Sequence, residues 1–268
     1  MTSRIERHEI TLKKVVYQLP GVDQVSVRRD VSYREADDLT MDLYYPLQAE
    51  AGVLLPAVVI VAGYPDVGVP NILGCKFKEM EMNISWGQLI AASGLVAVVY
   101  TNRDPVADVR SVLRFVRERA ATLGIDPHSI GLFAASGNAP TALSVLAQDG
   151  NDDITCAVLC CGFTLDLAGS TDVADAARKW RFVDACAGKS ISDFRCDVPL
   201  FIARAGQDQF GNTNIDRFAA AALSRNMPLT LVNHPAGPHA FDLFDNGSTS
   251  REIIRQMLAF MRFHLLSA

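Results

Sequence analysis

Short apolar runs alternate along this chain with longer segments of helical periodicity. In residues 104–123, apolar side chains recur at spacings of three and four, from Val109 and Val112 through Val116 to Ala120, which gives a helix one apolar face. This alternation is typical of a mostly parallel sheet with helices on both faces, because parallel strands are buried and need crossover helices. We therefore expect an α/β protein. The expected strands are 57–62, 96–100, 130–134, 156–161, 200–205 and 229–233, and the expected helices are 86–93, 104–123, 139–148, 214–225 and 249–265.

Three runs near the start of the chain differ because polar and apolar residues alternate in them. They cover residues 11–17, 25–33 and 40–45 and are rich in β-branched side chains. A period of two is typical of strands with one solvated face. We expect these runs to form an antiparallel edge of the sheet.

The connection between the expected strands 156–161 and 200–205 is much longer than the others. It has helical composition from Asp172 to Trp180, and Phe182 and Phe194 are candidate apolar anchors. Residues 163–197 are equally well interpreted as a lid insertion over a binding site or as a crossover helix with long loops. No repeat or linker divides the rest, so we expect residues 1–268 to form one domain.

The charge balance argues against two classes of partner. The chain has 25 Lys and Arg, 30 Asp and Glu, a net charge of −5 and no basic block, so it offers no electrostatic footprint for nucleic acid or an anionic membrane. Its apolar stretches are shorter than the roughly 20 residues that cross a bilayer. Residues 1–9 lack the apolar core of a secretory signal, so we expect a cytoplasmic protein.

The six cysteines are expected to be reduced in that compartment. Cys156, Cys160 and Cys161 lie in one apolar run. Adjacent residues of a strand point to opposite faces, so Cys160 and Cys161 are not expected to converge on a ligand. Buried thiols are the favoured interpretation, with a metal or redox role as the alternative.

The sequence Ala134-Ala135-Ser136-Gly137-Asn138 follows an expected strand and precedes a helix. A serine at the apex of a tight turn needs small neighbours, which Ala134 and Gly137 provide. Taken alone, Ser136 is as well explained as a helix cap as it is as a nucleophile.

A serine nucleophile needs a base and a carboxylate that orients the base. Asp208 follows the expected strand 200–205, and His239 lies in the loop after strand 229–233. The carboxyl ends of parallel strands meet at one edge of a sheet. Ser136, Asp208 and His239 are therefore expected to come together there.

Other candidates are weaker by position. Asp216 lies within an expected helix and Asp197 precedes a strand, which indicates structural or solvated roles, whereas Asp242 remains a competitor of Asp208. His128 follows an expected Asp126-Pro127 turn at the amino end of its strand and is expected to be structural. No partner pattern is found for His8, His234 and His264.

With its ordered segments LTMDLYYP, AGYPDVG, FAASGNAP, ARAGQD and GPHAFD, the chain resembles the α/β-hydrolases. It is most similar to the dienelactone-hydrolase-like and small carboxylesterase members, over about residues 39–265. The resemblance implies the α/β-hydrolase fold, with Ser136 as nucleophile, His239 as base and Asp208 as acid. It also implies an oxyanion hole formed by the backbone N–H groups of Tyr64 and Gly137.

Two departures from the family pattern stand out. The usual elbow is G-x-S-x-G, and here Ala134 and Asn138 replace the two glycines. Asn tolerates unusual backbone angles, so the turn can form with altered local packing and pocket shape. Dienelactone hydrolases proper carry a cysteine at the position of Ser136, which argues against a strict lactone hydrolase.

We therefore expect a serine hydrolase that cleaves a small-molecule carboxylic ester through an acyl-enzyme. Two alternatives stay open, a peptidase or amidase with the same triad, and a catalytically silent protein of this fold that binds a ligand or partner. Neither H-E-x-x-H nor a P-loop motif occurs, so no metal or other cofactor is expected. The specificity pocket is expected to be built from loops and from residues 163–197.

Overall fold

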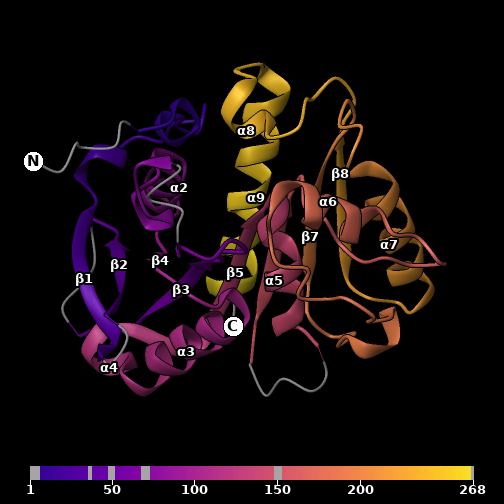
Figure 1. Cartoon of the computed structure of the whole chain (residues 1–268). Helices are drawn as coiled ribbons and strands as arrows, with labels where there is room; N and C mark the ends of the chain where they lie inside the picture. Colours follow the sequence, from indigo (N-terminus) through magenta and orange to yellow (C-terminus); the bar gives the residue numbers. More distant parts are fainter. Residues whose placement is uncertain (1–6, 36–37, 48–51, 68–72, 148–152, 267–268) are drawn as a thin grey trace, which may run out of the picture.

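The computed structural model describes residues 7–35, 38–47, 52–67, 73–147 and 153–266. Within them, eight strands form one sheet in the order β1-β2-β4-β3-β5-β6-β7-β8 (Figure 1). The first three strands in this order pair antiparallel, and all later neighbours pair parallel. The α/β class and the antiparallel N-terminal edge are confirmed. The strands are β1 (Ser26–Arg34), β2 (Leu39–Tyr45), β3 (Leu55–Ile60), β4 (Val96–Tyr100), β5 (Ile125–Ala135), β6 (Cys156–Cys160), β7 (Leu200–Ala205) and β8 (Leu229–His234).

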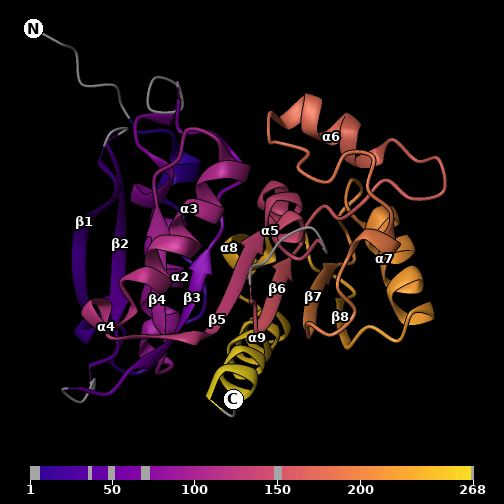
Figure 2. The ribbon, with the colours of Figure 1, turned by 90° about the horizontal axis from the view of Figure 1, so that it is seen from below.

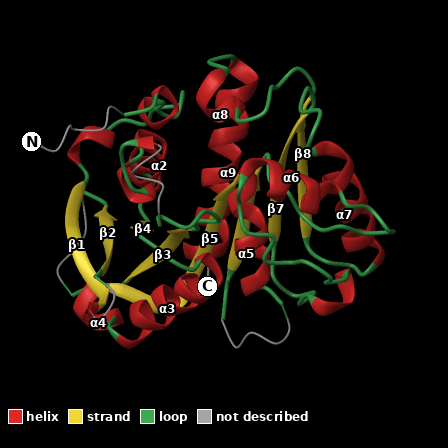
Figure 3. Ribbon diagram, in the orientation of Figure 1, coloured by secondary structure: helices red, strands yellow, loops and turns green. Residues whose placement is uncertain are grey.

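Helices cover both faces of this sheet (Figure 3). Helices α2 (Glu81–Ala92) and α9 (Ser248–Leu266) lie on one face, and α3 (Pro105–Glu118) and α5 (Ala139–Val145) lie on the other (Figure 1). The remaining α-helices are α4 (Ala120–Leu123), α6 (Asp172–Trp180), α7 (Asn212–Ser224) and α8 (Phe241–Phe244). The 3-10 turns are η1 (Glu9–Leu12), η2 (Val22–Gln24), η4 (Phe77–Glu79), η5 (Ser136–Asn138) and η6 (Ile191–Asp193).

Helix α3 begins where the sequence supplies a cap. Asp104 accepts hydrogen bonds from the Val106 and Ala107 N–H groups, each at 3.1 Å, and Pro105 occupies the first turn, where a missing N–H is harmless. The expected single helix 104–123 is two helices, because Arg119 leaves the helical region at φ −108° and ψ 12°. The apolar stripe is nevertheless buried against the sheet as expected.

The expected strand 11–17 is wrong. This segment contains part of the 3-10 turn η1 and then runs without regular structure, because the Val15 and Val16 N–H groups bond to helices and not to a neighbouring strand. Val15 N–H donates to Ser85 Oγ at 3.0 Å, and Val16 N–H donates to the Asp242 carbonyl oxygen at 2.9 Å. The β-branched side chains therefore reflect packing against α2 and α8.

Strand β5 is longer than expected and includes the predicted Asp126-Pro127 turn. Its register with β3 shifts between Leu55 and Ala57, and such a bulge accommodates a proline that cannot donate to the ladder. Helix α5 ends at Val145, and position 148, its expected end, lies outside the described residues.

Candidate active site

Ser136 lies at the turn between β5 and α5. Its φ is 55°, a left-handed conformation that residues other than glycine rarely adopt. The next position is crowded, because a Cβ on residue 137 would lie 2.5 Å from the Tyr64 hydroxyl oxygen and 2.6 Å from Phe182 Cδ1, so any other residue would displace these rings. The sharp strand-to-helix turn expected at Ser136 is therefore present.

The side chains of Ser136, His239 and Asp208 form one hydrogen-bonded row. Ser136 Oγ lies 2.7 Å from His239 Nε2, and His239 Nδ1 lies 2.7 Å from Asp208 Oδ2. The three residues follow β5, β8 and β7, at the carboxyl ends of these strands. The Gln207 N–H donates to the Gly237 carbonyl oxygen at 2.9 Å, which joins the loop of the acid to the loop of the histidine.

The environment of Asp208 fixes which nitrogen of His239 carries hydrogen. Burial alone would raise the pKa of Asp208, but hydrogen bonds from His239 and from the Phe210 N–H, at 2.9 Å, outweigh burial and lower this pKa. The carboxylate is then ionised at neutral pH and can only accept hydrogen bonds. His239 therefore donates through Nδ1, and its Nε2 is left to accept from the Ser136 hydroxyl.

The loop after β3 lies against the turn that carries Ser136. The Gly63 N–H donates to Asn138 Oδ1 at 2.7 Å, so this N–H is engaged. Among the described residues, no group accepts the backbone N–H of Tyr64 or of Gly137. These two N–H groups are the pair expected to form the oxyanion hole. Burial raises the pKa of the Tyr64 hydroxyl to about 12, so it stays protonated at neutral pH.

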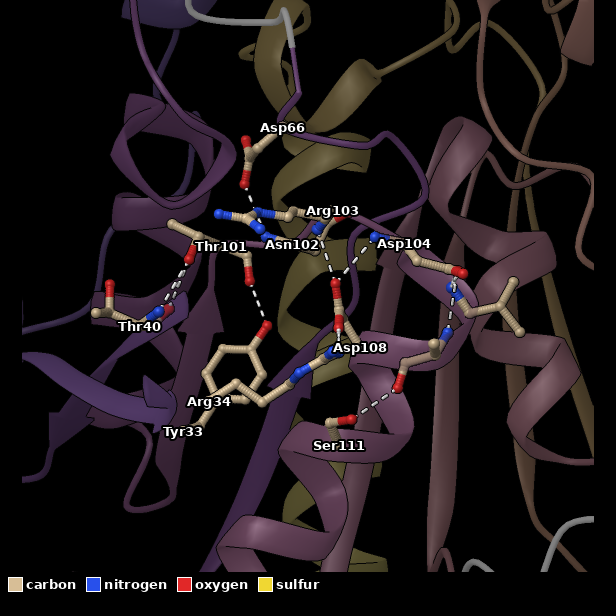
Figure 4. A network of polar contacts seen from close by, with 12 residues as sticks. Tyr33, Arg34, Thr40, Asp66, Thr101, Asn102, Arg103, Asp104, Asp108 and Ser111 are labelled. Atoms are coloured by element: carbon tan, nitrogen blue, oxygen red, sulfur yellow. Dashed lines mark hydrogen bonds and ion pairs between the residues drawn. The ribbon is translucent and has the colours of Figure 1, made fainter. Parts of the chain in front are cut away.

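Polar contacts from the end of β4 hold the same loop (Figure 4). Asp66 Oδ2 accepts from the Asn102 N–H at 2.9 Å. Outside the view of that figure, Asp66 Oδ1 accepts from the Phe77 N–H at 2.7 Å. Asn102 Nδ2 donates to the Tyr64 carbonyl oxygen at 3.1 Å. Burial raises the pKa of Asp66, although these two N–H groups partly oppose the effect. Asp66 is thus a structural anchor of the loop.

An apolar cavity of about 310 Å³ opens beside Ser136 and His239. Its polar side chains include Asp66, Asn83 and Asp242. Its apolar lining comes from the N-terminal segment, η4, α2, β5 and α8, and includes Ile10, Leu73, Phe77, Met80, Met82, Trp86, Phe133 and Leu243. No described residue of 163–197 lines this cavity, although the insertion was expected to help build the specificity pocket. The N-terminal segment contributes instead, because it packs on α2.

The insertion 163–197 contacts the site from another direction. Helix α6 lies beyond the carboxyl ends of β5 and β6, which the arrowheads mark (Figure 2). Phe182 stacks on Phe163 with ring centroids 5.0 Å apart and meets the Tyr64 ring edge-on at 6.1 Å. The Val183 N–H donates to the Gly63 carbonyl oxygen at 2.9 Å. The insertion therefore packs on the loop that carries the Tyr64 N–H.

Asp242 is a pocket residue whose position the sequence pattern did not reveal. The residue is 2% exposed, and its Oδ2 accepts from Trp86 Nε1 at 2.9 Å. Burial raises its pKa, and the Trp86 hydrogen bond only partly opposes the rise. Trp86 lies far away in the chain, so no local motif could indicate this contact.

Cys160 and Cys161 also line the cavity, which corrects the expectation that they point apart. The strand ends at Cys160, and Cys161 has a φ of 49°, which brings their sulfur atoms to 3.9 Å. Their hydrogen bond and burial raise the pKa of the Cys160 thiol, so it is protonated and unreactive at neutral pH. All six cysteines are free, and only Cys196 is not buried.

The remaining candidate residues lie outside the hydrogen-bonded row. Asp197 and Asp216 form exposed ion pairs with Arg195 and Arg204, at 2.9 and 2.8 Å, in agreement with the structural or solvated roles expected for them. His234 does have partners, which the sequence pattern did not reveal. Its Nε2 lies 2.9 Å from Ser250 Oγ and 3.1 Å from an oxygen of residue 245.

Comparisons with known proteins place the fold. No family model matches the chain, and no curated protein matches its sequence. The structure is similar to the thermophilic esterase Est2 of Thermogutta terrifontis, with a TM-score of 0.65 and 20% identity over 91% of this chain and 95% of Est2. A structure of the same esterase phosphonylated by sarin is also similar. Its TM-score is 0.64, with 19% identity over 92% of this chain and 97% of the esterase chain.

A second similar structure is the esterase LipW of Mycobacterium marinum, with a TM-score of 0.69 and 18% identity over 89% of this chain and 81% of LipW. Esterase B of Lactobacillus rhamnosis has a TM-score of 0.66 and 16% identity over 91% of this chain and 88% of that one. These similarities and the sheet order show that the chain has the α/β-hydrolase fold.

Two further observations concern the described part of the chain. None of its helices combines the length and the apolar character needed to cross a membrane. Nor do any three of its His, Cys, Asp or Glu side chains gather closely enough to hold a metal ion.

Proposed function

We propose that the protein is a serine esterase that hydrolyses small carboxylic esters through an acyl-enzyme intermediate. The observation that carries the proposal is the row from Ser136 Oγ through His239 to Asp208, with both contacts at 2.7 Å. A serine hydroxyl becomes a nucleophile when an oriented imidazole takes its proton. That several structurally similar proteins are named esterases supports the same reaction class.

In the first half of the reaction, Ser136 Oγ attacks the ester carbonyl carbon and His239 Nε2 takes the hydroxyl proton. The Asp208 carboxylate stabilises the imidazolium that forms. The N–H groups of Tyr64 and Gly137 donate to the oxyanion of the tetrahedral intermediate. His239 then gives its proton to the leaving alcohol, and the acyl group stays on Ser136.

In the second half, His239 takes a proton from water, which attacks the acyl carbon. The tetrahedral intermediate collapses, His239 returns the proton to Ser136 Oγ, and the carboxylic acid leaves. Each catalytic group is thereby restored. The exposed fraction of the His239 side chain is 37%, which gives water access to the imidazole.

The cavity beside Ser136 supports an ester with an apolar acyl chain. Its lining is mostly apolar and includes large side chains such as Met80, Met82 and Trp86. An apolar chain buried there gains about 25 cal/mol for each Å² removed from water. Anionic acyl groups are disfavoured because the described lining includes Asp66 and Asp242 but neither Lys nor Arg.

The insertion 163–197 serves this site as a lid in the same proposal. Its contacts with Tyr64 and Gly63 would couple lid movement to the oxyanion hole. A cytoplasmic location fits the free cysteines.

The test is hydrolysis of p-nitrophenyl butyrate by the wild-type protein and by Ser136→Ala. We expect turnover by the wild type and a loss of about 10⁴-fold or more in the variant. Equal rates for the two proteins would refute the proposal. A wild type that cleaves p-nitroanilides faster than esters would instead indicate an amidase.

A further inference from the structure

We infer that Asn138 is a positioning residue that fixes the oxyanion hole by occupying the Gly63 N–H and leaving the Tyr64 N–H for the substrate. The inference rests on the proposed esterase function and concerns which residue organises it. Asn138 occupies the position where the family elbow usually has glycine. Its side chain accepts a hydrogen bond from Gly63, which a glycine could not do.

The Gly63 peptide groups are both engaged. Its N–H donates to Asn138 Oδ1 at 2.7 Å, and its carbonyl oxygen accepts from the Val183 N–H at 2.9 Å. The next carbonyl oxygen, of Tyr64, accepts from Asn102 Nδ2 at 3.1 Å. The Tyr64 N–H lies between these fixed groups and has no acceptor among the described residues. The loop therefore holds one free donor in a fixed place.

The loop and the elbow approach each other too closely for a side chain at residue 63. A Cβ there would lie 2.7 Å from Asn138 Cα and closer still to the Gly137 carbonyl oxygen. Asn138 belongs to the same short turn as Ser136 and Gly137. Its hydrogen bond to Gly63 thus joins the nucleophile and both proposed donors into one unit.

Position matters because an oxyanion-hole donor acts only when it points at the charge that develops in the transition state. Loss of one donor typically costs 10²- to 10³-fold in kcat. A donor that remains but is no longer held in place should cost less. Ground-state binding depends little on this donor, so kcat should change more than KM.

Two variants test the inference. Asn138→Ala removes the acceptor, and Asn138→Asp keeps an acceptor oxygen for Gly63 but adds a charge beside the oxyanion hole. Asn233→Ala is the matched control, because Asn233 also accepts one hydrogen bond, from Arg204 at 2.9 Å, on the exposed edge of β8. The assay measures kcat and KM for p-nitrophenyl acetate, with folding checked by circular dichroism.

We expect Asn138→Ala to lower kcat about 10- to 100-fold with KM within about threefold of wild type, and Asn233→Ala to leave both unchanged. For Asn138→Asp, the ratio of its kcat to the wild-type kcat should fall as pH rises through the pKa of the new carboxyl group, because only the charged form repels the oxyanion. A purely structural role would give no such pH-dependent ratio.

Asn138→Ala with kcat within twofold of wild type would overturn the inference, and so would an Asn138→Asp ratio that is constant with pH. If Asn138→Ala does not fold, the pH dependence of Asn138→Asp decides alone. A wild type whose turnover does not require Ser136 would instead refute the esterase proposal, which keeps the two failures distinct.

Discussion

Nδ1 of His239 lies 2.7 Å from Oδ2 of Asp208. The two side chains differ in exposure, with an exposed fraction of 37% for His239 and 1% for Asp208. The acid is shielded from water while the histidine stays open to substrate. This difference suits a carboxylate that orients and an imidazole that transfers protons.

Asp208→Asn is expected to lower kcat for p-nitrophenyl butyrate by about 10⁴-fold while the protein still folds. The amide can donate to Nδ1, which would leave His239 with hydrogen on Nε2 and no acceptor for Ser136. Steady-state kinetics measures the effect. Asp216→Asn, at an exposed ion pair with Arg204, is the control and should keep wild-type kcat.

The stability of the same variant should depend on pH. The pKa of Asp208 is lowered in the folded state, so ionised Asp208 stabilises the fold above its unfolded pKa of about 3.9. That contribution is lost as pH falls through the lower folded pKa. The difference in unfolding free energy between wild type and Asp208→Asn should therefore shrink below about pH 4. A difference that grows on acidification would contradict the lowered pKa.

Asp242→Asn is expected to show the opposite trend. Burial raises the pKa of Asp242, so the wild type loses stability as pH rises from the unfolded value, about 3.9, toward the higher folded pKa. The amide can still accept from Trp86 and has no charge to bury. In urea titrations, the unfolding free energy of the variant should rise relative to that of the wild type between about pH 4 and pH 7. A difference that stays constant with pH would refute the raised pKa.

Replacing Ser136 should expose the cost of its backbone conformation. A residue other than glycine in the left-handed conformation destabilises the fold by roughly 1–2 kcal/mol. Glycine avoids this strain, but ordering its more flexible backbone costs about 0.5–1 kcal/mol of chain entropy. The free energy of unfolding of Ser136→Gly should therefore be about 0.5–1 kcal/mol larger than that of Ser136→Ala. At Ser111, inside α3, glycine should instead be about 1 kcal/mol less stable than alanine.

Much of the fold could be predicted because its elements are locally encoded. The stripe from Val109 to Val116 and the cap at Asp104 define α3, and the buried runs define the parallel strands. Segment 11–17 could not be predicted, since its N–H groups bond to Ser85 and to the Asp242 carbonyl group, far away in the chain. Propensity alone does not distinguish such packing from strand pairing.

The same division applies to the candidate site. Ser136, Asp208 and His239 each follow a strand, so the sheet edge that brings them together follows from strand order. The hydrogen bond from Gly63 to Asn138 and the contact of Asp242 with Trp86 depend on side-chain geometry between distant segments. Only coordinates reveal contacts of that kind.

The width of the cavity should set the preference for acyl chain length. Met82 is half-buried on α2 and lines the cavity, so Met82→Trp should fill part of it with little change in the thermal midpoint. We expect kcat/KM for p-nitrophenyl hexanoate to fall at least about 10-fold relative to acetate. An unchanged ratio would place the acyl chain elsewhere.

Covalent trapping by an organophosphorus probe shows directly whether Ser136 is the nucleophile. The wild type, Ser136→Ala and His239→Ala would be treated with a fluorophosphonate, digested and analysed by mass spectrometry. We expect one added phosphonyl group on Ser136 in the wild type, none at any site in Ser136→Ala, and labelling slowed by orders of magnitude in His239→Ala. A folded wild type that hydrolyses p-nitrophenyl butyrate while Ser136 stays unlabelled, or that carries the label on another residue, would contradict it.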